Sequence, residues 1–224
     1  MNPREVAVRK LFSRIARYYD VLNGVISFGL HRGWRRQAIQ MLDPQPGWRC
    51  LDVCSGTGDF ALATQVRGCK PVAFDMTPEM LSVARKRSAG TLDVVMGDAL
   101  SLPFGDATFD CVTLGFGLRH SKQDLPVLLR ELARVAKPGA RLVSLELSHP
   151  PNRLWRFLSN IYIHMFLPII GGVYDREAYL YLSKSVADFP DAPHLAQMLV
   201  VAGFSSCDHK LLTGGVAAIH LAVK

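Results

Sequence analysis

Short apolar runs alternate with amphipathic segments through the middle of the chain. Runs of apolar and β-branched residues predict five strands, at 50–54, 71–74, 93–96, 111–114 and 141–145. Between them, apolar residues recur at helical spacing over 60–67, 78–87 and 125–136. Strands that alternate with helices form a parallel sheet that is covered on both faces. We therefore expect an α/β fold.

The two ends of the chain depart from this alternation. Residues 4–19 and 31–42 predict two helices around the turn-like Asn23-Gly24 and 27–29, and residues 152–167 predict a long apolar helix. A helix at 193–202 is followed by runs at 206–212 and 216–223, which predict an antiparallel hairpin with an antiparallel edge strand. We expect one domain over 1–224, with an N-terminal helical cap (1–47), a cofactor-binding core (48–150), a helical lid or substrate insert (151–190) and a C-terminal helix and hairpin (191–224).

Composition narrows the class of protein. With 224 residues and 49% hydrophobic residues, the chain can bury one sizeable core. The apolar stretch 161–173 is interrupted by His164 and Pro168, and it is shorter than the roughly 20 residues that span a bilayer. Five cysteines, an odd number without CxxC spacing, predict neither a disulfide framework nor a metal site. The first residues do not have the pattern of a secretory signal, so we expect the protein to lie in the reducing environment of the cytoplasm.

The net charge of +7 favours acidic surfaces, and many of the basic residues lie in the first 36 positions. This basic cluster fits a solvated helix face, and it also fits peripheral contact with the anionic inner face of a membrane. No nucleic-acid-binding motif accompanies it. The oligomeric state stays open, with a homodimer as one option.

The segment 51–59 reads as an apolar strand, a glycine turn and the start of a helix. Glycines let backbone N–H groups approach a ligand that a β-carbon would exclude. Gly56, Gly58 and Ala61 also satisfy G-x-G-x-x-G/A, so this segment alone does not separate NAD from S-adenosylmethionine. Asp75 ends the second strand, 17 residues after Gly58, where both cofactors need a carboxylate for the ribose hydroxyls.

Residues after the third strand favour S-adenosylmethionine. Asp98, in Gly97-Asp98-Ala99, stands where class I methyltransferases hold an acid near the adenine amine. Taken singly, Asp52 also fits a helix cap or turn acceptor, and Asp98 a loop cap. An NAD oxidoreductase would need room for a substrate domain, and 224 residues leave little. The expected cofactor-binding residues are Asp52, Gly56, Thr57, Gly58, Asp75, Met76, Asp98, Ala99 and Gly115.

Three further segments carry a family resemblance: FSRIARYYDVLN (12–23) with SFGLHRGWRR (27–36), FGLRH (116–120), and YLYLSKSV (179–186) followed by Phe189-Pro190. With them the chain resembles the UbiE/MenG ubiquinone and menaquinone C-methyltransferase family along nearly its whole length. The resemblance implies a class I, Rossmann-like, seven-stranded and mostly parallel sheet with an antiparallel C-terminal strand. It also implies S-adenosylmethionine as cofactor and a prenylated quinol as substrate, demethylmenaquinol first and the ubiquinol precursor as its equivalent.

C-methylation of a quinol requires alignment with the methyl donor and loss of a hydroxyl proton. In the family, the arginine of the Gly-Leu-Arg-Asn loop is thought to act through water, and its counterpart is Arg119. His120 stands where the family usually has Asn, so we expect His120 to accept the proton and Arg119 to stabilise the phenolate. Tyr18, Asp20 and Tyr174 are expected to orient the ring, and Glu146 and His149 to lie at the same rim.

Alternatives remain at this stage. His120 also fits a structural role, and its departure from the family leaves room for another phenolic or lipid-like acceptor. A non-catalytic member of a quinone-biosynthesis assembly is a further alternative. The apolar segment 154–166 fits either a surface for the prenyl tail or a helix buried against the sheet.

Overall fold

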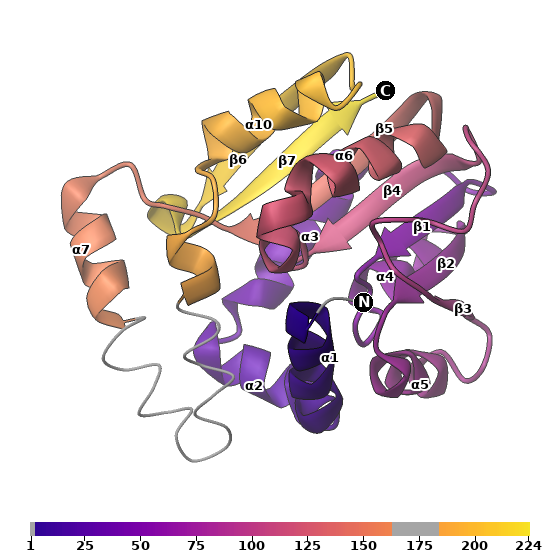
Figure 1. The fold of residues 1–224 in the computed structure, drawn as a ribbon, viewed down its shortest axis with the longest axis horizontal. Coiled ribbons are helices and arrows are strands. Elements are labelled where there is room, and N and C mark those ends of the chain that lie inside the picture. Colours follow the sequence, from indigo (N-terminus) through magenta and orange to yellow (C-terminus); the bar gives the residue numbers. More distant parts are fainter. Residues whose placement is uncertain (1–2, 163–183) are drawn as a thin grey trace.

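The computed structural model describes residues 3–162 and 184–224, and it is built around one seven-stranded sheet (Figure 1). The strand order is β3-β2-β1-β4-β5-β7-β6. Five strands run parallel: β1 (Arg49–Val53), β2 (Lys70–Asp75), β3 (Asp93–Met96), β4 (Phe109–Gly115) and β5 (Ala136–Leu147). All five expected core strands are confirmed, although β5 begins earlier than expected and contains Pro138 and Gly139.

The C-terminal hairpin is formed by β6 (Ser206–Leu212) and β7 (Ala217–Val223). Strand β7 is antiparallel to both β5 and β6, which confirms the expected antiparallel C-terminal strand. It lies inside the sheet, however, and not at the edge as we expected. The residue types explain this order. Ala217, Ala218 and Ile219 of β7 are buried, whereas β6 carries exposed polar residues such as Asp208 and Lys210, which suit an edge strand.

Helices cover both faces of the sheet (Figure 1). On one face lie α3 (Leu30–Leu42), α4 (Asp59–Val66) and α5 (Pro78–Arg87), and on the other lie α6 (Leu125–Val135) and α10 (Ala192–Val201). The apolar stripe of α6 shows why it docks there: Leu125, Leu128, Leu129 and Leu132 are at most 1% exposed. Each such leucine contributes about 1.5–3 kcal/mol through burial.

The N-terminal segment folds as two short helices, α1 (Pro3–Ile15) and α2 (Tyr19–Ile26), where we expected one helix over 4–19 followed by a turn. Asn23 and Gly24 lie inside α2. A glycine costs a helix about 1 kcal/mol, and burial of Leu22 against Ile15, Ile26 and Tyr162 offsets that cost. In Figure 1, α1 lies near α5, and the Ser13 hydroxyl donates a hydrogen bond of 2.7 Å to Glu79.

Helix α7 (Arg153–Ile161) follows β5 and carries apolar side chains that face solvent. The Asn152 carboxamide oxygen caps it by accepting hydrogen bonds from the N–H groups of Leu154 and Trp155. No residue of α7 is buried, and Leu154 and Phe157 are 65% and 62% exposed, so α7 is not a helix buried against the sheet. The rest of the expected insert, with Tyr174 and most of the segment at 179–186, lies outside the described residues.

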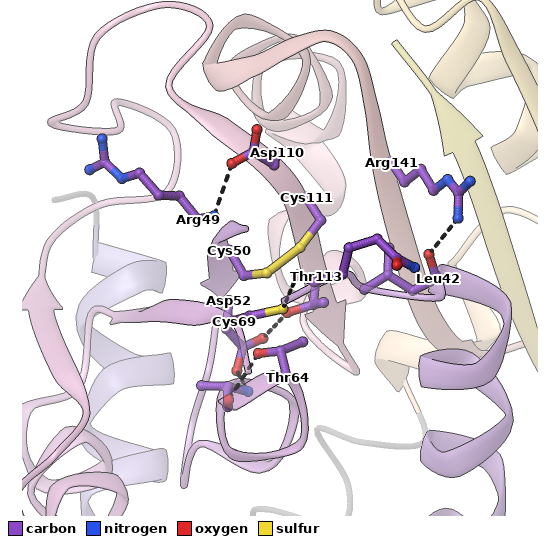
Figure 2. Close-up of a disulfide and its surroundings, with 12 residues drawn as sticks. Leu42, Arg49, Cys50, Asp52, Thr64, Cys69, Asp110, Cys111, Thr113 and Arg141 are labelled. Atoms are coloured by element: carbon purple, nitrogen blue, oxygen red, sulfur yellow. Dashed lines mark hydrogen bonds between the residues drawn. A yellow bond between two sulfur atoms is a disulfide. The ribbon is translucent and has the colours of Figure 1, made fainter. Parts of the chain in front are cut away.

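Cys50 of β1 and Cys111 of β4 form a disulfide, which corrects our expectation that the cysteines are unpaired (Figure 2). The two residues are register partners on neighbouring parallel strands. Their separation of 61 positions gives no local signal, because only the pairing of β1 with β4 brings them together. Cys54, Cys69 and Cys207 are free.

Two further features of residues 3–162 and 184–224 bear on the class of protein. No helix there is long and apolar enough to cross a membrane. In the same residues, no group of three or more His, Cys, Asp or Glu side chains could hold a metal ion.

Candidate active site

A cavity of about 110 Å³ lies at the carboxyl ends of β1, β2, β3 and β4. Strand order reverses between β1 and β4, and ligands of open α/β sheets bind at such switch points. The cavity brings together seven of the residues that we expected from the sequence: Gly56, Asp75, Met76, Asp98, Ala99, Gly115 and His120.

The glycine turn, residues 54–58, joins β1 to α4 in a conformation that side chains would obstruct. Gly58 has a φ of 83°, and a β-carbon there would lie 2.9 Å from that of Ala84. The turn is also approached closely from the next loop, since a β-carbon on Gly117 would lie 2.6 Å from that of Cys54. These glycines therefore let two backbone segments meet beside the cavity.

Asp75 connects the end of β2 to the glycine turn. Its Oδ2 accepts a hydrogen bond of 2.8 Å from the Gly56 N–H, and its Oδ1 accepts one of 2.8 Å from the Thr77 N–H. Burial raises the pKa of Asp75, although these backbone hydrogen bonds act in the opposite direction. Carboxylate oxygens have two lone pairs each, so Asp75 can still accept bonds from ligand hydroxyls.

Asp52 lies beneath the glycine turn, where it is almost completely buried. Its Oδ1 accepts from the Thr113 hydroxyl at 2.8 Å (Figure 2). Its Oδ2 accepts from the Ala61 N–H at 3.0 Å. Burial raises the pKa of Asp52 to about 7, while the Thr113 and Ala61 bonds lower it. Asp52 thus holds the first turn of α4 against β4, and it also lines a second, smaller cavity.

The position of Asp98 fits both interpretations from the sequence, a loop cap and an acid that faces the cofactor. Its Oδ1 accepts a hydrogen bond of 2.9 Å from the Leu100 N–H, which is a loop cap. The residue is nevertheless exposed and lines the main cavity. A capped carboxylate keeps its second oxygen for a ligand.

A polar network surrounds Thr57 on the outer side of the glycine turn. The Thr57 hydroxyl donates to Asp20 at 2.7 Å, and Arg87 donates to the Thr57 carbonyl at 2.8 Å. Arg87 also pairs with Asp59 at 2.8 Å, and Arg35 pairs with the other Asp59 oxygen at 2.6 Å. Asp20, which we expected to orient a substrate ring, therefore contacts the turn.

Arg119 lies behind the cavity wall. Its Nη1 pairs with Oε1 of the buried Glu146 at 2.6 Å and also donates to the Phe116 carbonyl. Both side chains are nearly inaccessible, at 6% and 1% exposure. This placement favours a role in holding the 116–120 loop over the direct phenolate contact that we expected.

Aromatic side chains form the wall of the cavity beside His120. The Phe12 ring meets the His120 ring edge-to-face, with centroids 5.0 Å apart. Tyr19 lines the cavity, whereas Tyr18, our candidate from the sequence, is 57% exposed. Sequence reasoning missed Phe12 and Tyr19, although both lie in the family-specific segment. If the start of α2 had been predicted correctly, its helical periodicity would have shown that Tyr18 and Tyr19 point in different directions.

Comparisons with known proteins show the family to which the chain belongs. A family model described as the ubiE/COQ5 methyltransferase family matches residues 1–224. A demethylmenaquinone methyltransferase of Shouchella clausii is 38% identical, with 99% of this chain and 97% of the relative covered. A Cereibacter sphaeroides protein named ubiquinone/menaquinone biosynthesis C-methyltransferase UbiE is also 38% identical, with 95% and 88% covered.

Solved structures confirm the fold. A Thermotoga maritima protein, described as an S-adenosylmethionine-dependent methyltransferase and a possible histamine N-methyltransferase, superposes with a TM-score of 0.69 at 20% identity. The match covers 96% of this chain and 99% of that one, and at such identity it shows the class I fold alone. Because a full-length family match accompanies this fold, the chain belongs to the ubiE/COQ5 methyltransferase family and is an S-adenosylmethionine-dependent methyltransferase.

Proposed function

We propose that this enzyme methylates a ring carbon of a prenylated quinol, with demethylmenaquinol as the preferred substrate. The observation that carries the proposal is the aromatic wall of Phe12 and Tyr19 beside His120, directly next to the glycine turn. This wall offers a flat, apolar surface to a quinol ring together with a group that can accept its proton. Relatives named demethylmenaquinone methyltransferase support the choice of quinol.

The main cavity fits S-adenosylmethionine by its shape and polarity. Gly56 of the glycine turn borders open space in the cavity, where a β-carbon would meet nothing nearer than 3.9 Å, and Asp75 and Asp98 present acceptors at the ends of β2 and β3. We assign Asp75 to the ribose hydroxyls, Asp98 to the adenine amine, and Met76 and Ala99 to the walls around the adenine. When bound, the cofactor supplies an electrophilic methyl group.

In this proposal His120 accepts the proton of the quinol hydroxyl. An imidazole ordinarily titrates near pH 6.5, so its neutral form is abundant at physiological pH. Phe12 holds the imidazole ring by its edge-to-face contact. Glu146 and Phe116 fix Arg119, and Arg119 in turn fixes the backbone of the loop that carries His120. Arg119 is thus a positioning residue.

The substrate is a lipid, and the surface formed by α2 and α7 suits contact with a membrane. Tyr162, just after α7, donates a hydrogen bond of 2.7 Å to the Ile26 carbonyl, so the two segments adjoin. Exposed apolar side chains lie on α2, on the turn that follows it and on α7: Val21, Phe28, Leu154, Trp155 and Phe157. Exposed Arg17, Arg32, Arg153 and Arg156 accompany them, as expected for contact with anionic headgroups.

Sedimentation with lipid vesicles tests this surface. We expect binding to vesicles that contain phosphatidylglycerol, weaker binding at high salt, and little binding to phosphatidylcholine alone, because salt screens exposed charges beyond about 8 Å at physiological ionic strength. Phe157→Ser should weaken binding, whereas Val201→Ser, at an even more exposed apolar position on α10, should not. Equal effects of the two substitutions would reject the assignment.

Transfer of a labelled methyl group tests the proposed substrate. Purified enzyme should label demethylmenaquinol faster than a ubiquinol precursor, and an unprenylated phenol slowest. Faster labelling of a phenol that lacks the tail would favour the alternative of another phenolic acceptor. Binding of S-adenosylhomocysteine without labelling of any quinol would favour the non-catalytic alternative.

A further inference from the structure

A second cavity of about 20 Å³ adjoins the main one. Tyr19, Cys54, Gly56 and Gly115 line both cavities, so they meet across the glycine turn. The second cavity is also lined by Arg35 of α3, which comes from the family-specific N-terminal segment. None of our sequence-based assignments gave Arg35 a role.

The guanidinium of Arg35 is held firmly but incompletely paired. Its Nη1 lies 2.6 Å from the Asp59 carboxylate, and its centre lies 5.6 Å from the centroid of the Phe116 ring. The side chain is only 15% exposed. Its Nε is buried and has no hydrogen-bond partner among the described residues. A buried charged donor without an acceptor is costly, so this atom points to a ligand.

The ion pairs around Arg35 engage its Nη1 and leave its Nε without a partner among the described residues. Asp59 is shared, because its Oδ1 accepts from Arg87 at 2.8 Å while its Oδ2 faces Arg35. Arg87 has Asp20 as a second partner at 3.3 Å, whereas Asp59 is the carboxylate that pairs with Arg35. When the Nη1 of an arginine is already paired, the edge of the guanidinium that carries Nε can still donate hydrogen bonds. The spacing of the donors on this edge matches the two oxygens of a carboxylate.

We propose that Arg35 binds the carboxylate of the amino-acid end of S-adenosylmethionine. Residues suited to the adenosine, Asp75, Asp98 and Ala99, line the main cavity and not the second one. A molecule that continues past the glycine turn reaches the second cavity, where Arg35 is the cationic lining residue. This inference rests on the cofactor-binding function of the site and adds the residue that recognises one end of the cofactor.

Calorimetry with three ligands tests the proposal. S-adenosylhomocysteine has the carboxylate, its decarboxylated analogue lacks only that group, and 5′-methylthioadenosine lacks the whole amino-acid end. We expect Arg35→Gln to weaken binding of S-adenosylhomocysteine about 10- to 100-fold, the usual effect of losing a charge-assisted bond, and to leave the other two ligands nearly unchanged. Arg36→Gln, an exposed position on the same helix, is the matched control and should leave all three affinities unchanged.

Three outcomes overturn the assignment. If Arg35→Gln weakens all three ligands equally, Arg35 only supports the structure of the site. If the wild-type enzyme binds the decarboxylated analogue as tightly as S-adenosylhomocysteine, no residue recognises the carboxylate, and this result does not depend on whether the variant folds. Wild-type enzyme that binds none of the three ligands would reject the proposed function itself.

Discussion

The Thr57 hydroxyl donates a hydrogen bond of 2.7 Å to the Asp20 carboxylate, and this contact ties α2 to the glycine turn. The other oxygen of Asp20 lies 3.3 Å from Arg87 of α5. Three segments far apart in the sequence therefore meet at one carboxylate. Because Tyr19 precedes Asp20 and lines both cavities, the same contact holds an aromatic ring at the place where the two cavities meet.

Asp20→Ala should weaken binding of S-adenosylhomocysteine by about 5-fold, the effect of losing roughly 1 kcal/mol at a partly exposed hydrogen bond. Thr57→Val should have a similar effect, and the double variant should lose less than the sum, because both substitutions remove the same contact. Calorimetry on the four proteins measures the coupling. Ser13→Ala, which removes a hydrogen bond between α1 and exposed Glu79, serves as control. Strictly additive losses would show that the contact does not support binding.

Asp75→Ala should reduce affinity for S-adenosylhomocysteine by about 2–4 kcal/mol, because charge-assisted bonds to the ribose are lost. The structure adds a second effect. The substitution also deprives the Gly56 and Thr77 N–H groups of their acceptor, so stability should fall by about 1–3 kcal/mol. Urea unfolding and calorimetry separate the two effects. Asp93→Ala, at an exposed position on β3, should change neither, and an unchanged dissociation constant in Asp75→Ala would exclude the ribose assignment.

His120→Ala should lower turnover about 10²- to 10⁴-fold, the usual contribution of a positioned base, while S-adenosylhomocysteine still binds. His120→Asn restores the residue usual in the family and should keep measurable activity. The rate of this variant should no longer decline when the pH is lowered past about 6 to 7, the range in which an imidazole becomes protonated. Rate measurements between pH 5 and 9 test this. A His120→Ala enzyme with wild-type turnover and the same acid limb would assign the histidine a structural role.

Asp52 should make stability depend on pH. Burial raises its pKa in the folded protein to about 7, above the ordinary value of 3.8. The folded protein therefore binds this proton more tightly than the unfolded chain, and its contribution to stability is lost as pH rises from about 4 to 7. Asp52→Asn should flatten this slope, because an amide can accept from Ala61 and donate to Thr113 without a charge. Urea unfolding at pH 5 and pH 8 measures it, with Asp93→Asn as control, and an unchanged slope in Asp52→Asn would contradict the assignment.

The disulfide predicts a thiol count. Denatured protein should show three reactive thiols before reduction and five after it, since Cys54, Cys69 and Cys207 are free. Replacing both Cys50 and Cys111 with alanine should cost about 4 kcal/mol, because a loop of this length loses much entropy when it is closed in the unfolded chain. Five thiols in unreduced protein would exclude the bond.

Local patterns predicted the core of the fold well, and contacts between distant segments account for the differences. The strand β3 and the helix α5 have the expected bounds, because a short apolar run and helical spacing are both visible within a few residues. The break between α1 and α2 was missed, since it depends on Leu22 packing against Tyr162, 140 positions away. Likewise, the position of β7 depends on its pairing with β5, which no turn signal encodes.

The residues of the site divide in the same way, into those that local sequence predicts and those that contacts between distant segments position. Asp75 and Gly56 line the cavity, and their positions could be predicted because they depend on where a strand ends, a property of the local sequence. Arg35 and Tyr19 reach the site from the N-terminal helices, and their positions depend on how those helices dock. Arg119 was placed in the right loop, but its orientation follows from Glu146 on β5, which the sequence does not link to it.

The bond between Cys50 and Cys111 also has a topological consequence. It closes a covalent ring that contains the glycine turn, Asp75 and Asp98, so the part of the chain assigned to the adenosine is one macrocycle. A protease that cuts the exposed turn at 105–107 would open this ring without releasing a fragment. The nicked enzyme would migrate as a single chain on a denaturing gel until a reductant separates its two pieces.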